Sequence, residues 1–186
     1  MKTALIPLLI LLGSYTTFGQ GFSSGKINAS QWDTDVVITL KSDNGPDEIR
    51  IATKGKKTRR SYQKVKNLKI NENSYQLIES CGSINILNEK GETLLKTNQD
   101  RSEIFLMNHE KFTRKKAKGN SGVFEYVNGN QQVIVSGQVK GGVIQLKNHS
   151  GEVRDALIAL CLEELLQHAY DRYLNAIMTS SFLAQV

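Results

Sequence analysis

Hydrophobic residues follow two different patterns along the chain, and each pattern predicts its own kind of secondary structure. Up to about residue 150, short runs of apolar and β-branched residues, such as 36–40 (VVITL), alternate with clusters of turn residues. Over residues 152–178 the apolar positions recur at helical spacing. The pattern therefore predicts a β-rich chain that ends in one long helix.

The predicted helix divides into two parts. Residues 156–162 (ALIALCL) are all apolar, and a helix that is apolar on every side is normally buried on every side. About 27 residues of helix span roughly 40 Å, whereas strands of five to seven residues build a sheet only about 17–23 Å tall. We therefore expect the sheet to enclose the helix up to Leu162, with Glu163 and Glu164 marking the point where it leaves the core. From Leu165 onward we expect a surface helix with one apolar stripe that includes Tyr170 and Tyr173.

The rest of the chain reads as about eight to ten short strands. Asn/Gly turn signals join several of them, for example 88–91 (NEKG) and 128–130 (NGN). Strands do not alternate with helices, so we expect an antiparallel barrel or strongly curved sheet, with the helix packed in or against it. One domain over residues 36–178 is predicted, after an irregular Ser/Gly/Asn-rich segment at 20–35 and before a tail at 179–186.

The first 19 residues have the layout of a secretory signal peptide. Lys2 precedes an apolar run at 4–12, and Thr17 and Gly19 occupy the −3 and −1 positions for cleavage before Gln20. The apolar run is too short to span a bilayer. We expect export to the periplasm or the exterior, and an uncleaved anchor is the alternative.

Several segments resemble the tubby C-terminal-like superfamily, which covers tubby domains, phospholipid scramblases and LURP-one-related proteins. The resemblance extends over about residues 75–166 and lies in paired strands joined by Asn/Gly turns (INILNEKGETLLK and VFEYVNGNQQVIVSG), a last hairpin (GGVIQLKNHSGE) and a plug-like helix (RDALIALCLEELL). It implies a closed barrel threaded by the C-terminal helix. It also implies binding of phosphoinositides or other lipids through a basic barrel surface, with no individual binding residue carried over.

Two basic runs are the candidates for such a surface. The chain has 24 Lys and Arg against 18 Asp and Glu, a net charge of +6. Residues 54–69 hold eight basic residues and no acidic one, and 111–118 form the second run. Anionic lipid or polysaccharide is the expected partner, although such runs also serve solubility or protect edge strands. With Tyr62 the one aromatic residue in the first run, nucleic acid is not expected. The candidate ligand-binding residues are Lys56, Lys57, Arg59, Arg60, Arg114, Lys115 and Lys116.

Other chemistry is sparse. No serine elbow, His-Glu metal motif, Gly-rich phosphate loop or Cys-x-x-Cys occurs, so neither an enzyme nor a cofactor is expected. Glu164 and His168 stand four residues apart, and we expect a solvated helix pair rather than a metal site. Cys81 and Cys161 either form a disulfide or stay reduced.

Asn28 and Asn148 both begin glycosylation sequons. Whether they are used depends on the host, and the position of Asn148 in a predicted turn leaves room for a glycan.

Four functions remain open. The favoured one is an exported, non-enzymatic binding module for an anionic ligand. The alternatives are a lipocalin-like carrier of a small hydrophobic ligand, an envelope interaction or assembly protein that uses the Tyr170/Tyr173 face, and a hydrolase. A carrier needs an empty barrel with the helix outside it, so the position of residues 156–162 separates the first two.

Overall fold

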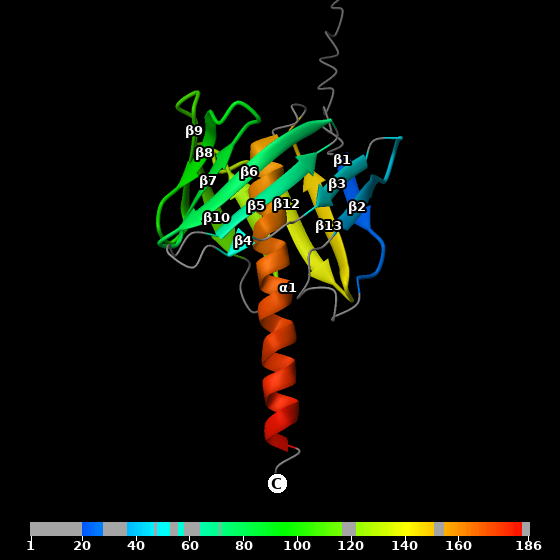
Figure 1. Ribbon diagram of the computed structural model, residues 1–186. Helices are drawn as coiled ribbons and strands as arrows, with labels where there is room; N and C mark the ends of the chain where they lie inside the picture. The colour runs from blue at the N-terminus through cyan, green and yellow to red at the C-terminus, as the bar shows by residue number, and fades with distance from the viewer. Residues whose placement is uncertain are drawn as a thin grey trace, which may run out of the picture.

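A thirteen-stranded antiparallel sheet winds around the first part of one long helix, α1, in the computed structural model (Figure 1). The structure describes residues 20–27, 37–46, 48–52, 56–57, 64–70, 72–116, 122–150 and 155–183. The strands are β1 Gln20–Ser24, β2 Val37–Ser42, β3 Glu48–Ala52, β4 Lys56–Lys57, β5 Lys64–Ile70, β6 Asn73–Ser80, β7 Ser83–Leu87, β8 Thr93–Thr97, β9 Glu103–Leu106, β10 Lys111–Lys116, β11 Val123–Val127, β12 Val133–Lys140 and β13 Val143–Asn148, and α1 is Asp155–Leu183.

The sheet is a meander with one exception to sequential order. From β4 to β13 each strand pairs with its neighbour in sequence, and then β1 pairs with β13 on one side and β2 on the other. Residues 20–24, for which composition predicts irregular structure, are therefore a central strand. The prediction failed because QGFSS has the composition of a loop. It forms a strand because it pairs with β13 on one side and β2 on the other.

The sheet curls until its two ends nearly meet. β3 is the last strand at one end and lies in contact with β5 at the other, where β4 covers only the first part of the β5 edge. This barrel-like sheet confirms the predicted fold class.

Asparagine organises several of the turns. The Asn88 side-chain oxygen accepts hydrogen bonds from the amides of Lys90 and Glu92, and Asn128 does the same for Asn130 and Gln132. In both turns the residue three positions after the asparagine has a positive φ, 78° at Gly91 and 62° at Gln131. The Asn side-chain oxygen thus accepts hydrogen bonds from turn amides that have no strand partner.

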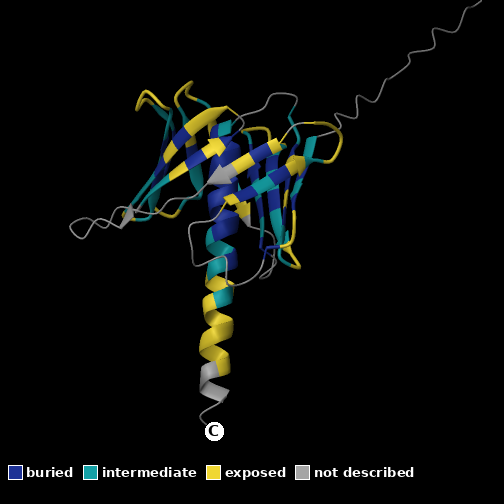
Figure 2. Cartoon of the chain, turned by 45° about the vertical axis from the view of Figure 1, so that its right-hand side comes forward, coloured by how far each residue is buried: buried dark blue, intermediate teal, exposed yellow. Residues whose placement is uncertain are grey.

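The helix is enclosed by the sheet. All eleven residues from Ala156 to Leu166 are buried, in agreement with their apolar character on every side. Inward-facing strand residues such as Leu40, Ile86 and Ile144 surround them. Figure 2 shows the buried part of α1 inside the barrel and the exposed part beyond it. The expectation that the helix leaves the core at Glu163 is wrong, since burial continues to Leu166 and includes Ala169.

The helix approaches β12 so closely that one strand position must lack a side chain. A Cβ atom on Gly137 would lie 2.7 Å from both Cys161 Sγ and Leu165 Cδ1. Gly137 therefore lets α1 pack against the backbone of β12.

Candidate functional site

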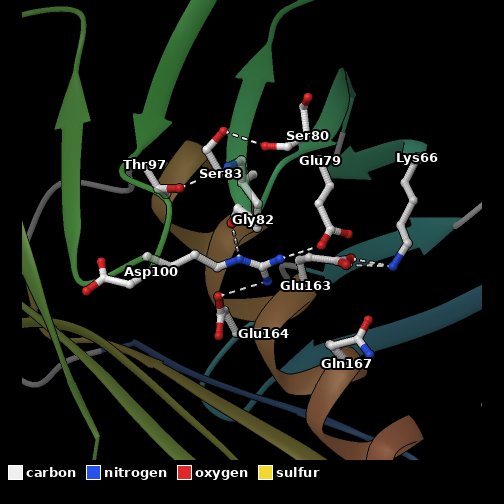
Figure 3. Close-up of polar contacts among 12 residues, drawn as sticks. Lys66, Glu79, Ser80, Gly82, Ser83, Thr97, Asp100, Glu163, Glu164 and Gln167 are labelled. Carbon is white, nitrogen blue, oxygen red and sulfur yellow. Dashed lines mark hydrogen bonds and ion pairs between the residues drawn. The ribbon is translucent and has the colours of Figure 1, made fainter. Parts of the chain in front are cut away.

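The two acidic residues in the middle of α1 are buried inside the barrel and paired with basic residues from its wall. Glu163 is 1% exposed, and Lys66 of β5 donates to both of its carboxylate oxygens, with Nζ–O distances of 2.6 and 2.8 Å (Figure 3). Burial raises the pKa of Glu163, and the Lys66 ammonium partly offsets this. The pair therefore joins the helix to the side of the barrel where the two ends of the sheet nearly meet, here called the seam.

Glu164 is bound from a different part of the wall. Its carboxylate accepts from Arg114 of β10 and from Arg101 Nη1 at 3.3 Å. Arg101, in the turn between β8 and β9, also bonds Glu79 through Nη2 at 2.6 Å and the Gly82 carbonyl through Nε at 2.8 Å (Figure 3). Together these contacts connect α1 to β6, β10 and two turns.

This network fixes the position of the helix. A buried charge is tolerated only when it is paired, and each pair here defines one position of α1 relative to the wall. The two ends of the enclosed segment are also distinguished, because Asp155 bonds Tyr75 at the start of the helix. The sequence signal for the network was a Glu-Glu pair inside an apolar helix, whereas its partners Lys66, Glu79 and Arg101 had no local signal.

His168 packs against the wall rather than forming a solvated pair with Glu164. Its ring lies edge-on to Phe124, with centroids 5.9 Å apart, and its Nε2 is buried without a hydrogen-bond partner. Burial lowers the pKa of His168. The expected solvated Glu164–His168 pair is therefore wrong, because both side chains face the barrel. Among the described residues no group of His, Cys, Asp and Glu is arranged to hold a metal.

The candidate basic residues divide between the interior and the surface. Arg114 points inward to Glu164 and is only 9% exposed, so it does not belong to a surface patch. Lys115 is exposed on the opposite face of β10, as strand alternation requires. Lys56, Lys57 and Lys116 have a described backbone only, in β4 and at the end of β10. Arg59 and Arg60 lie outside the described residues.

Exposed basic side chains lie at both ends of the barrel, and four of them lie at or near the end from which α1 leaves. The strand directions place the ends of β10 and β12 there, together with the chain just after β1. The Ile27 amide bonds the Gly142 carbonyl at 2.9 Å, which brings the residues after β1 beside the turn that follows β12. We call this group the exit rim: Lys26, Lys115, Lys140 and Arg172.

The described acidic residues are distributed differently. Asp100 and Asp171 are exposed at the exit end. The described turns and strand ends at the opposite end of the barrel carry five exposed acids, Asp43, Glu48, Glu72, Glu89 and Glu92. Five exposed lysines at the opposite end, Lys41, Lys69, Lys90, Lys111 and Lys147, are offset by these five acids. The described exposed charge is therefore more positive at the end from which the helix projects.

The projecting part of α1 corrects a second expectation. Tyr170 and Tyr173 are half-buried at the mouth of the barrel, but residues 174–180 are exposed on all sides. The helix continues to Leu183 through much of the predicted tail. It therefore extends beyond the barrel instead of lying along its surface (Figures 1 and 2). In the described part of the chain, no helix has the length and apolar character needed to span a membrane.

A hollow of about 420 Å³ lies on the outer face of the sheet, over β1, β11, β12 and β13. At its side, Ser136 Oγ and His149 Nε2 are 2.8 Å apart, a distance suited to a nucleophile and its base. However, Ser136 sits in mid-strand between two paired strands, where backbone amides serve the sheet rather than an oxyanion. The His149 amide also bonds the Ile134 carbonyl at 2.7 Å, so we interpret the contact as a tie between the end of β13 and β12.

The two cysteines do not form a disulfide, and the asparagine of one glycosylation sequon is buried. Cys81 lies exposed in the turn between β6 and β7, Cys161 is buried inside the barrel, and both are free thiols. Asn148 is 1% exposed, and its side-chain oxygen accepts from the Ser150 amide and hydroxyl. The expected room for a glycan at Asn148 is therefore not present, and Asn28 lies outside the described residues.

The barrel interior is filled by α1. In the described part of the chain, strand residues and helix residues form one continuous buried cluster, so α1 occupies the space in which a carrier of the lipocalin kind holds its ligand. The arrangement instead presents a filled barrel with a helix that projects from one end.

Comparisons with known proteins add no relative to this picture. No family model matches the chain, and no match was found among curated proteins or solved structures. The likeness to the tubby-like superfamily stays a prediction from sequence pattern.

Proposed function

We propose that the protein is an exported, non-enzymatic module that binds membranes carrying anionic lipid head groups. The observation that carries the proposal is the exit rim, four exposed basic side chains that only two of the described exposed acids offset, at the end of the barrel where the helix projects. Near an anionic surface each Lys or Arg contributes about 1 kcal/mol. Four such residues at one end also orient the molecule, because the acids lie mainly at the other end.

The construction of the barrel supports a docking role. Its interior is occupied and its helix is held by buried ion pairs, which suits a rigid platform better than a container. Gln20 is the first residue of β1, so cleavage before it would leave the sheet complete. Mass spectrometry of exported protein should find Gln20 at its N-terminus. If residues 1–19 were still present, the proposed cleavage would be wrong.

Vesicle flotation tests the surface assignment. The rim variant replaces Lys26, Lys115, Lys140 and Arg172 with Gln, and a matched control replaces four exposed lysines elsewhere, Lys41, Lys69, Lys90 and Lys147. Both variants lose four positive charges. We expect the native protein to bind phosphatidylserine-containing vesicles, the rim variant to bind at least about tenfold more weakly, and the control to bind nearly as well as the native protein.

Three results would count against the proposal. Equal loss by both variants would show that net charge, rather than the exit rim, drives binding. Binding that does not weaken with salt would exclude an electrostatic anchor. If the native protein did not bind vesicles but bound an anionic polysaccharide, the ligand of the exit rim would be a soluble or wall-bound polyanion instead of a membrane.

A further inference from the structure

The last part of α1 is helical and without charge, and its residues 174–180 are exposed. Residues 173–183 (YLNAIMTSSFL), here called the helix tip, contain no Asp, Glu, Lys or Arg. Leu174, Ile177 and Met178 are 38%, 42% and 58% exposed. An exposed helix ordinarily carries charged residues on the faces that meet water. The helix tip instead combines apolar residues with polar residues that carry no charge.

Two polar side chains of the helix tip are internally satisfied. Thr179 Oγ1 donates to the Asn175 carbonyl and Ser180 Oγ to the Ile177 carbonyl, both at 2.8 Å. Hydroxyl groups bonded in this way lose less on transfer from water to hydrocarbon, because they need no water partner. These contacts lower the cost of burying the helix tip in lipid.

The length of the helix tip matches one leaflet. About eleven residues at 1.5 Å each reach roughly 16 Å, and half of a bilayer's hydrocarbon core is about 15 Å. The helix projects along the axis of the barrel (Figures 1 and 2), so it would enter a membrane end-on rather than lie along its surface.

The residues around the base of the helix tip match the head-group layer. Tyr170 and Tyr173 sit at the mouth of the barrel, and tyrosine favours the membrane interface. Asp171 and Arg172 lie between them in the sequence, and the rest of the exit rim lies at strand ends of the same end of the barrel. Apolar tip, tyrosines and basic residues therefore follow one another in the order in which a membrane presents hydrocarbon, interface and anionic head groups.

We propose that the helix tip inserts end-on into one leaflet of an anionic membrane, with the exit rim held at the head groups. This inference rests on the proposed function and adds to it a depth and an orientation. Membrane binding then has two parts, an electrostatic one from the exit rim and an apolar one from the helix tip, as stable peripheral anchoring requires.

A fluorophore on the helix tip tests insertion separately from binding. In a Cys81→Ser background, Met178→Cys is labelled with an environment-sensitive dye, and Lys90→Cys at the opposite end is the control. On phosphatidylserine-containing vesicles we expect the dye at 178 to shift to the blue and to be quenched by lipids that carry a quencher in the acyl chain. The dye at 90 should stay in water, although the same vesicles float both proteins.

Two variants of equal charge complete the test. Met178→Asp adds a carboxylate to the helix tip, whereas Asn130→Asp adds one to an exposed turn at the other end. Since a charged residue is costly within hydrocarbon, we expect Met178→Asp to weaken vesicle binding by on the order of tenfold to a hundredfold. Asn130→Asp should change it little.

The outcomes separate the inference from the proposed function. Vesicle binding with an unquenched dye at 178 would overturn insertion and leave electrostatic docking intact. Absence of binding to any vesicle would overturn both. A dye at 178 that is already shielded without vesicles, in a protein of doubled mass, would show that a second copy covers the helix tip, and insertion would again be wrong.

Discussion

Lys66 and Glu163 form an ion pair across the inside of the barrel, with Lys66 Nζ 2.6 and 2.8 Å from the two oxygens of a carboxylate that is 1% exposed. The contact ties β5, at the seam of the sheet, to the middle of α1. Because α1 is held there and also at Glu164, its enclosed half cannot slide along the barrel without breaking buried charge pairs.

Breaking this pair should destabilise the fold. We expect Lys66→Met to lower the free energy of unfolding by about 3–5 kcal/mol, because it leaves the Glu163 carboxylate buried without its partner. The double variant Lys66→Met/Glu163→Leu should recover much of the loss. Urea denaturation measures both, and a double variant no more stable than Lys66→Met would show that the charge pair is not the cause.

Arg114 and Lys115 are neighbours in sequence with opposite roles. We expect Arg114→Met to cost about 3–5 kcal/mol, because Glu164 loses a buried partner, with little direct effect on vesicle binding. Lys115→Met should change stability by less than about 0.5 kcal/mol and weaken binding to anionic vesicles. Thermal melting and flotation of the two proteins distinguish these roles, and the reverse result would contradict the inward placement of Arg114.

Gly137 should resist enlargement. A valine there brings its Cβ against Cys161 and Leu165 and adds two further methyl groups, so α1 has to move or the strand has to shift. We expect a loss of about 1–3 kcal/mol in the free energy of unfolding. Gly129, where an added Cβ meets nothing within 4 Å, is the matched control, and an equal loss there would attribute the effect to glycine replacement in general.

His168 gives the fold a dependence on pH. Burial lowers the pKa of His168 in the folded state, so the folded protein binds the proton less readily than the unfolded chain. Its contribution is therefore complete above the unfolded pKa of about 6.5 and is lost as the pH falls through the lower folded value. The raised pKa of Glu163 acts in the opposite direction in the native protein and in the His168→Phe variant alike. On acidification from about pH 7.5 to pH 5.5, we therefore expect the stability of the native protein to fall relative to that of His168→Phe.

Denaturation midpoints at several pH values check this prediction. His149 also has a pKa lowered by burial, so the native protein and the His168→Phe variant share that part of the dependence. The difference between the two curves isolates His168, and parallel curves would show that its titration does not contribute.

Aspartate at three enclosed positions should prevent folding. Leu157, Ala159 and Leu160 point in different directions around α1, and each is at most 1% exposed. A helix that lay on the outside of a sheet would tolerate Asp on at least one of these faces. We expect Leu157→Asp, Ala159→Asp and Leu160→Asp each to abolish the thermal melting transition, and an unchanged transition in any of them would contradict the enclosed helix.

Much of the fold was predictable because the signals are local. The all-apolar run at 156–162 indicated burial on every side, and Asn/Gly turns indicated the hairpins. β1 was missed because QGFSS has no strand signal, and it is a strand only because β2 and β13 offer it two edges. Pairing between segments that are distant in the sequence cannot be predicted from the residues of either segment alone.

The candidate site was less predictable than the fold. Glu163 and Glu164 predicted the point where the helix reaches solvent, because adjacent acidic residues are usually exposed. Their burial depends on Lys66, Arg101 and Arg114, which lie 97, 63 and 50 residues away along the chain. For the same reason Arg114 read as a surface residue, although strand alternation alone places either Arg114 or Lys115 inside.

Hydrogen exchange along α1, with and without phosphatidylserine-containing vesicles, tests both the enclosure of the helix and the insertion of its tip. Amides of 156–166 should be strongly protected in both conditions, because opening them requires the barrel to unfold. Amides of 173–183 should exchange rapidly in solution, where a short isolated stretch of helix is only marginally stable, and slowly on the vesicles. Rapid exchange at 156–166 would contradict the enclosed helix, and exchange at 173–183 that vesicles leave unchanged would contradict insertion of the helix tip.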